Sequence, residues 1–269
     1  MQSLIQVEDL RKHYLGRRVL GSGEAVSALN GVSFSAAPGR TLALVGESGS
    51  GKSTLALCLA GLERPASGRI WFGGRDIVML NERQLREVRP EIQLVFQDPA
   101  SSLNPRFTAL EIVAEPLLVQ RSGGRSEKRD QALALLERVG LSREMASRKI
   151  GEFSGGQRQR LAIARALTLA PQLLILDEAL SALDCSVQAQ IANLLMELQS
   201  SLALTYLFIT HDLAMAAQLG DEIAVIDRGR IVEQGVPENV LCTPEHEATR
   251  RLVAAIRGSN FTPRLPRPF

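Results

Sequence analysis

The chain has 269 residues, of which 45% are hydrophobic and 22% charged, as in ordinary globular proteins. Its 31 basic and 29 acidic residues leave a formal charge of +2, which argues against a nucleic-acid partner. Three widely separated cysteines, Cys58, Cys185 and Cys242, favour neither a disulfide framework nor a zinc site, and fit a reducing cytosol. The sequence has no run of roughly 20 apolar residues and no signal-peptide pattern at Met1–Lys12. We therefore expect a chain that remains inside the cell and reaches a membrane only through partners.

The N-terminal region, Ile5–Leu44, has period-two patches and breaks at Gly16 and Gly21–Gly23, which predict an antiparallel β subdomain. Continuous aliphatic runs then predict strands buried on both faces, as in a parallel sheet covered by helices. These strands are Thr41–Val45, Ile92–Phe96, Leu173–Leu176, Thr205–Ile209 and Ile223–Ile226. Helical periodicity marks Ser53–Leu62, Arg129–Val139, Gly155–Thr168 and Val187–Leu198. The predicted class is α/β with a mostly parallel sheet.

The region from Asp98 to Ile150 differs, because it is rich in helix formers and lacks a clear strand. We interpret it as a helical subdomain inserted in the α/β core, continuing through the next helix to about residue 165. After Gly258 the proline- and arginine-rich segment 259–269 predicts a disordered tail. The expected organisation is a single domain over residues 1–258.

The segment Gly46–Ser53 matches the pattern G-x-x-x-x-G-K-S/T, between a predicted strand and a predicted helix. Such glycines let backbone N–H groups surround a polyphosphate at the positive end of the helix. Lys52 is expected to reach the β- and γ-phosphates, and Ser53 to ligate Mg²⁺. The predicted ATP-binding residues are Gly46, Glu47, Ser48, Gly49, Ser50, Gly51, Lys52, Ser53 and Thr54. The ordinary alternative is a chance glycine-rich turn.

The run Leu173–Leu176 ends in Asp177 and Glu178, where a P-loop ATPase needs acidic residues at the end of a buried strand. Asp177 is expected to hold Mg²⁺ through water, and Glu178 to act as general base on the attacking water. By itself such a strand end could simply expose two acids to solvent. Its pairing with the Gly46–Ser53 loop in one chain favours the catalytic interpretation.

The segment Phe153–Gln157 (FSGGQ) predicts a helix start with Ser154 as N-cap and two glycines at its positive end. In chain order, a strand is followed by the glycine-rich loop Gly46–Ser53 (the cradle), the helical insertion, the SGGQ segment and the LLILDE strand end. This order resembles that of the nucleotide-binding domain of ABC transporters, from about Leu4 to Ile256. This resemblance implies a P-loop NTPase core and ATP hydrolysis with Mg²⁺. It also implies that Ser154, Gly155, Gly156 and Gln157 act in trans, on ATP held by a second subunit.

The same resemblance assigns roles to four further residues. Tyr14 is similar to the aromatic residue that stacks on adenine, although alone it would more often be a half-buried strand residue. Gln97 resembles the glutamine that contacts Mg²⁺ and water and senses the membrane partner. Asp184, in Ser181–Asp184, resembles the D-loop at the dimer interface. His211 resembles the switch histidine on the γ-phosphate, although a lone histidine is more often structural.

A narrower resemblance is to the peptide/nickel importer branch. It is carried by Val95–Arg106 (VFQDPASSLNPR), by Phe153–Arg165 and by Leu183–Gln190. Importers of this branch imply two permease subunits, a second and non-identical ATPase, and an extracytoplasmic binding protein. The chain would then be peripheral at the cytoplasmic face of the membrane and would touch it only through the permeases. Alanine at position 179 and the short C-terminal region weakly favour nickel or a metallophore over peptides as the cargo.

A different class remains open: a soluble ABC ATPase acting on ribosomes or DNA. Such chains typically carry two cassettes or a long coiled-coil insertion, and this sequence has one cradle and no heptad run. A non-hydrolysing cassette would show a damaged Glu178 or His211, and both residues are present. The motifs fix neither the cargo nor the choice between pairing with itself and pairing with another ATPase.

Overall fold

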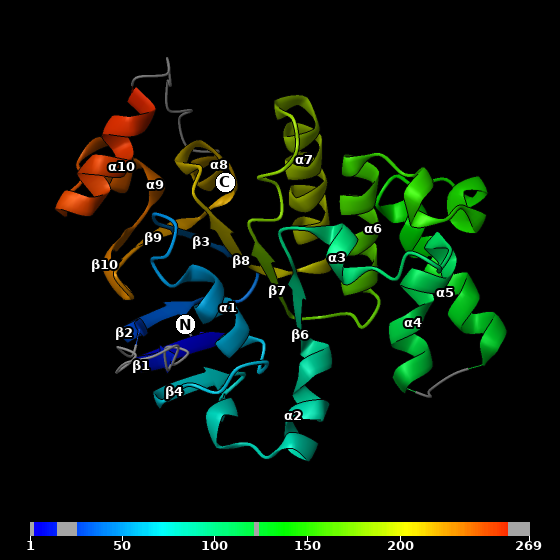
Figure 1. Cartoon of the computed structure of the whole chain (residues 1–269), viewed down its shortest axis with the longest axis horizontal. Coiled ribbons are helices and arrows are strands. Elements are labelled where there is room, and N and C mark those ends of the chain that lie inside the picture. Colours follow the sequence, from blue (N-terminus) through cyan, green and yellow to red (C-terminus); the bar gives the residue numbers. More distant parts are fainter. Residues whose placement is uncertain (1–2, 15–25, 121–123, 258–269) are drawn as a thin grey trace, which may run out of the picture. The chain divides into compact units, whose positions relative to one another are not determined.

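The computed structural model describes residues 3–14, 26–120 and 124–257, which form two compact units (Figure 1). The first unit runs to Glu87 and resumes at Thr205, and the second is Val88–Leu204. The predicted breaks at Gly16 and Gly21–Gly23 and the predicted tail lie outside the described residues. None of the helices within the described ranges is long and apolar enough to span a bilayer.

The first unit contains an antiparallel sheet in the order β2-β1-β4-β5. Its strands are β1 (Ile5–Tyr14), β2 (Val26–Ala36), β4 (Ser67–Phe72) and β5 (Arg75–Asp76). The predicted antiparallel subdomain is therefore confirmed, but its boundary at Leu44 was wrong. Thr41–Leu44 belongs to a fully buried parallel strand, and the remaining antiparallel strands come from Ser67–Asp76. Local periodicity did not reveal this non-local pairing.

A second group of strands in this unit has the order β10-β9-β3-β8. Its members are β3 (Thr41–Val45), β8 (Thr205–Thr210), β9 (Glu222–Asp227) and β10 (Arg230–Gly235). Strand β3 pairs in parallel with both neighbours, and Val45 lies opposite Thr210 and Val225. Every residue of β3 and β8 is buried, as their continuous apolarity predicted.

The helices of the first unit begin with α1 (Lys52–Leu59), which follows β3. It is shorter than the predicted Ser53–Leu62, and the chain turns at Gly61 with φ +64°. The other helices of this part of the chain are α2 (Glu82–Val88), α8 (Leu213–Leu219), α9 (Pro237–Cys242) and α10 (Glu247–Arg257).

The second unit pairs two parallel strands, β6 (Ile92–Val95) and β7 (Leu173–Asp177), with Val95 opposite Leu176. Strand β6 ends one residue before the predicted Phe96. The helices are α3 (Pro99–Ser102), α4 (Ala109–Gln120), α5 (Arg125–Arg138), α6 (Gly155–Leu167) and α7 (Cys185–Leu202). Between Asp98 and Ile150 the described residues are helical or turn, apart from one isolated bridge between Thr108 and Lys149. The predicted helical insertion is confirmed.

Candidate nucleotide-binding and hydrolysis site

The predicted cradle leaves the carboxyl end of β3 and leads into α1. Glu47, Ser48 and Gly49 are exposed, whereas Gly46 and Ser50 are buried. Gly49 (φ +81°) and Gly51 (φ +108°) have left-handed backbones that favour glycine. The loop therefore presents an exposed rim above a buried base, at the N-terminus of an eight-residue helix.

Two of its glycines are required by close backbone approach. A Cβ on Gly46 would lie 2.3 Å from the carbonyl oxygen of Ile226, and one on Gly51 would lie 2.4 Å from that of Ala28. Real side chains do not tolerate such contacts with backbone, so both positions fix the loop against neighbouring strands. The cradle is thus a packed element of the first unit, held closely against neighbouring backbone.

Lys52 lies inside the loop and is only 4% exposed. Its Nζ donates to the carbonyl oxygens of Gly46 at 2.8 Å and Glu47 at 2.9 Å. A buried ammonium held at the helix N-terminus provides a positive centre for phosphate oxygens. Ser53 is exposed and Thr54 partly exposed in the first turn of α1.

The β9–β10 turn also holds the cradle, and the motif analysis did not identify it. Gly229 N–H donates to the Ser50 carbonyl at 2.9 Å, and Asn30 N–H donates to the Gly229 carbonyl at 2.8 Å. The Asn30 side chain donates to the Arg228 carbonyl, also at 2.8 Å. The signal in the sequence was Asp227-Arg-Gly-Arg230, a turn between an apolar run and the next strand.

His211 and Tyr14 lie in the same unit as the cradle. His211 directly follows β8, and because Thr210 is opposite Val45, His211 and Gly46 leave the sheet at the same edge. His211 is exposed. Tyr14 ends β1 opposite Val26 and is 37% exposed.

The second unit brings Gln97, Asp177 and Glu178 to one edge. Gln97 follows β6, and Glu178 follows Asp177 at the end of β7, whose Leu176 pairs with Val95. Asp177 is only 8% exposed. Glu178 has φ +48°, a left-handed backbone that is uncommon for a residue with a side chain and is concentrated at functional sites.

Ser181 connects Gln97 to Glu178. Its hydroxyl donates to the Glu178 carbonyl at 2.9 Å, and Gln97 Nε2 donates to the Ser181 hydroxyl oxygen at 3.4 Å. The Ser181 N–H also donates to the Glu178 carbonyl, at 3.1 Å. These bonds hold the left-handed backbone of Glu178 and link it to the glutamine.

The SGGQ segment begins α6 as predicted. Ser154 accepts from Gln157 N–H at 3.3 Å, and the Gln157 side chain accepts from Ser154 N–H at 3.0 Å, which is a capping box. Ser154 and Gly155 are exposed. Asp184 caps α7 by accepting from Val187 N–H at 2.9 Å, a role the motif analysis had not assigned.

A glycine cradle with an internal lysine after a parallel strand, together with an acidic strand end, defines a P-loop ATPase. Residues 29–181 match the family model described as ABC transporter. The dipeptide transport ATP-binding protein DppF of Escherichia coli is 44% identical over 98% of this chain and 78% of its own length. The di/tripeptide transport ATP-binding protein DppF of Pseudomonas aeruginosa is 42% identical over 99% and 83%.

A solved dimer of the ATP-binding cassette MJ0796, bound to ADP and Pi, is similar in structure, with a TM-score of 0.77 and 31% identity. The similarity covers 87% of this chain and 98% of that one. The chain belongs to the ABC transporter family, whose members hydrolyse ATP to drive transport.

Proposed function

We propose that this chain is the ATP-hydrolysing subunit of an importer that takes up peptides. The observation that carries the proposal is the glycine cradle with Lys52 inside it, in a chain whose relatives are named for dipeptide and tripeptide transport. Those names support peptides rather than nickel or a metallophore, and they give no support to a ribosome- or DNA-associated role. Residues 1–258 would act as one ATPase domain, with residues 98–165 as its helical insertion.

ATP is proposed to bind through the residues of the cradle, with Tyr14 stacking on adenine. The left-handed glycines at 49 and 51, the N-terminus of α1 and the buried Lys52 ammonium supply donors and positive charge for a polyphosphate. Exposed side chains at 47, 48 and 53 leave the rim of the loop open to such a ligand. The base then stacks on a half-exposed aromatic ring at the end of β1.

The proposed Mg²⁺ ligands are Ser53, Gln97 and Asp177, a set of oxygen donors that suits this hard cation. Among the described residues no group of three or more His, Cys, Asp or Glu side chains could hold a metal without further ligands. This fits Mg²⁺ that is bound mainly by nucleotide phosphates and only partly by protein. When bound, the ion neutralises charge on the transferred phosphoryl group.

Hydrolysis is proposed to use Glu178 as the general base, with His211 contacting the γ-phosphate. The bonds from Ser181 to the Glu178 carbonyl hold the left-handed backbone that carries this carboxylate. Ser154–Gln157 would act on ATP held by a second ATPase subunit, and Asp184 would lie at the interface between the two subunits. The exposed start of α6 supports this proposal, because Ser154 and Gly155 are available to a partner.

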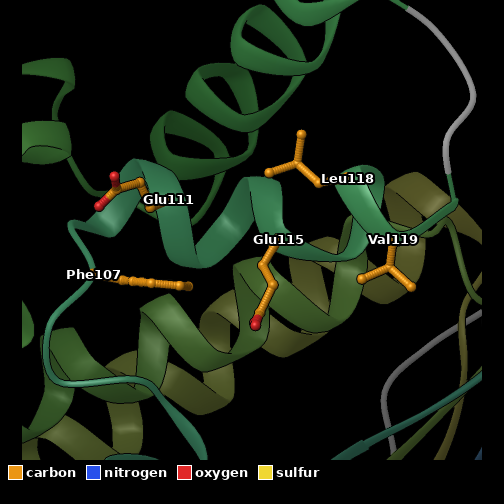
Figure 2. A pocket seen from close by; sticks show the side chains of 5 residues that line it. All are labelled: Phe107, Glu111, Glu115, Leu118 and Val119. Atoms are coloured by element: carbon orange, nitrogen blue, oxygen red, sulfur yellow. The ribbon is translucent and has the colours of Figure 1, made fainter.

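The proposed partners are two permeases, a second and non-identical ATPase, and an extracytoplasmic binding protein. The chain would sit at the cytoplasmic face of the membrane and contact it only through the permeases. A groove of about 510 Å³ in the second unit supports the proposal that a permease helix docks on this chain (Figure 2). Phe107, Glu111, Glu115, Leu118 and Val119 line it.

The groove combines acidic and apolar side chains along α4. Leu118 is 57% exposed and Val119 is 76% exposed. Glu115 pairs with Arg165 at 2.9 Å. The Thr108 N–H and hydroxyl donate to Glu111 and lower its pKa, so this carboxylate remains charged. A short permease helix with apolar and basic residues fits these features.

The test is reconstitution of the chain with its permeases and binding protein in liposomes, with radiolabelled dialanine and radioactive nickel as separate probes. We expect ATP-dependent uptake of dialanine that is lost when Glu178→Gln replaces the wild-type chain. Uptake of nickel without dialanine would overturn the proposed cargo. Co-purification of the tagged chain with ribosomes instead of permeases would overturn the transport role.

A further inference from the structure

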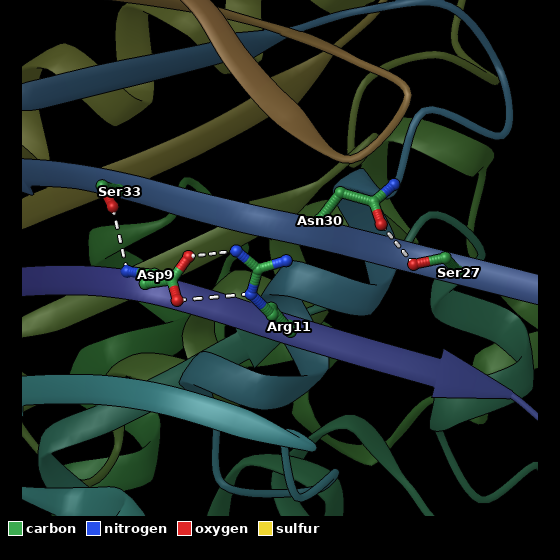
Figure 3. Close-up of polar contacts among 5 residues, drawn as sticks. All are labelled: Asp9, Arg11, Ser27, Asn30 and Ser33. Carbon is green, nitrogen blue, oxygen red and sulfur yellow. Dashed lines mark hydrogen bonds and ion pairs between the residues drawn. The ribbon is translucent and has the colours of Figure 1, made fainter.

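A β-bulge decides which side chains of β1 face the cradle side of the sheet. Ile5 and Val7 are buried, but the next buried residue is Leu10, so the inward-facing parity changes within the strand. The change falls at Asp9, which has φ +44° and whose N–H donates to the Ser33 hydroxyl at 2.9 Å. The Arg11 guanidinium also donates to the Asp9 carboxylate (Figure 3), from Nη2 to Oδ1 at 2.8 Å and from Nε to Oδ2 at 3.2 Å. In a strand, residues two apart share a face, so Lys12 and Tyr14 follow Leu10.

Lys12 is anchored on this face. Its Nζ donates to Glu63 Oε2 at 2.7 Å and to the Arg64 carbonyl at 2.8 Å, and its side chain is 14% exposed. The Glu63 hydrogen bond raises the pKa of Lys12 despite its partial burial, so the side chain remains charged. The same Nζ lies over the ring of Tyr14, 5.1 Å from the centroid, within the range of a cation–π interaction.

Tyr14 is linked by strand pairing to the cradle. It lies opposite Val26 on β2, two residues before Ala28, whose carbonyl blocks any side chain at Gly51. Ala28 is itself skipped in the register between Lys12–Leu29 and His13–Ser27, which is the last of three register shifts between β1 and β2. The end of β1 is thereby fixed relative to the first turn of α1.

We infer that Lys12 is the positioning residue for Tyr14: it occupies one face of the ring, fixes the ring through Glu63 and Arg64, and reserves the opposite face for a purine base. The inference rests on the proposed role of Tyr14 in ATP binding. A flat ring with a fixed cation behind it loses little entropy when a base stacks on its front. The predicted consequence is base-specific: Lys12 strengthens binding of ATP but not of inorganic triphosphate, which has no base.

Calorimetric titration of the isolated chain with ATP and with inorganic triphosphate, both with Mg²⁺, tests the inference. Lys12→Met is expected to weaken ATP binding about two- to fivefold and to leave triphosphate binding unchanged. Lys12→Arg, which keeps the cation, should retain the wild-type ratio of the two affinities. Arg69→Met is the matched control, because Arg69 lies over Trp71 at 5.9 Å in the same sheet.

A double-mutant cycle separates this inference from the proposed function. In a Tyr14→Ala background, Lys12→Met should have no further effect on ATP binding. An equal loss of ATP and triphosphate binding in Lys12→Met, or a loss that persists without Tyr14, would overturn the positioning role alone. If Tyr14→Ala left the preference for ATP over triphosphate unchanged, the adenine platform itself would be wrong.

Discussion

Gly156 packs directly against Val187: a Cβ built on Gly156 would lie 2.5 Å from Val187 Cγ1. A Cβ on the adjacent Gly155 would meet its nearest neighbour, Leu183 Cδ2, at 3.5 Å, an ordinary van der Waals distance. The absence of a side chain therefore matters for different physical reasons at the two glycines of the SGGQ segment. Gly156 is required for the packing of α6 on α7, and Gly155 is exposed and open to a ligand.

This difference predicts opposite outcomes for the two positions. Gly156→Ala should lower the free energy of unfolding by about 1–3 kcal/mol, because the methyl group overpacks the contact with Val187. Gly155→Glu should leave the melting temperature unchanged but abolish ATP hydrolysis in the assembled complex, since it places a bulky acid where phosphate is expected. ATP binding by the isolated chain should persist. A parallel loss of binding and hydrolysis in Gly155→Glu would refute action in trans.

Replacement of the proposed base should separate binding from turnover. Glu178→Gln is expected to bind ATP normally while hydrolysis falls at least about 100-fold, because the carboxylate activates water and does not hold the nucleotide. ATP should then accumulate in a closed dimer, detectable by size-exclusion chromatography. Lys52→Ala is the contrasting variant and should weaken nucleotide binding itself. Steady-state ATPase activity of Glu178→Gln within about threefold of wild type would remove Glu178 from the mechanism.

Asp184 should show two separable roles. The Val187 N–H, and next the Ser186 hydroxyl, donate to its carboxylate and lower its pKa. Asp184→Ala removes the N-cap of α7 and should lower the melting temperature by a few degrees, whereas Asp184→Asn should not, because asparagine caps equally well. If the charge also serves the subunit interface, Asp184→Asn should lose ATPase activity with its melting temperature intact. An unchanged melting temperature in Asp184→Ala would show that the cap contributes nothing.

Glu233 should make the anchoring of α10 depend on pH. Burial alone would raise the pKa of Glu233. The N–H groups of His246 and Glu245 donate to its carboxylate, and the Thr249 hydroxyl lies nearby without a hydrogen bond. Together these groups lower the pKa below the ordinary 4.5. The folded state thus favours the carboxylate. Its stabilisation is complete above the unfolded-state pKa and is lost as the pH falls through the folded value.

The measurement is urea denaturation of wild type and Glu233→Gln across pH. The variant should be less stable by about 1 kcal/mol at neutral pH, because a neutral amide accepts these bonds more weakly. The difference should shrink below about pH 4.5. A difference that stays constant down to the acid limit of folding would show that ionisation of Glu233 does not matter.

Phe107 tests the coupling of hydrolysis to transport. Phe107→Glu places a charge in the α4 groove and should reduce binding-protein-stimulated ATPase activity in the assembled complex, while basal activity of the isolated chain changes little. Met79, an apolar residue 80% exposed and outside the groove, provides the control variant Met79→Glu. If Phe107→Glu lowers the melting temperature of the isolated chain, the residue serves the core and the coupling role fails.

The sequence alone determined the parts of this protein whose chemistry is local. Continuous aliphatic runs predicted β3, β7 and β8, and the Ser154 cap predicted the start of α6 at Gly155. The position of the cradle loop between a strand and a helix could also be predicted, since its glycines, lysine and helix start have fixed spacing. Such signals depend on neighbours a few residues away, which the chain brings together in any fold.

Only the tertiary structure showed what depends on residues far apart in the chain. The pairing of β4 with β1, the Gly229 turn on Ser50 and the packing of Gly156 against Val187 leave no periodic pattern in the sequence. The bulge at Asp9 likewise decides whether Lys12 faces Glu63, because one inserted residue moves every later side chain of a strand to the other face. Register and close approach are set by the contacts of the folded chain, and local composition does not specify them.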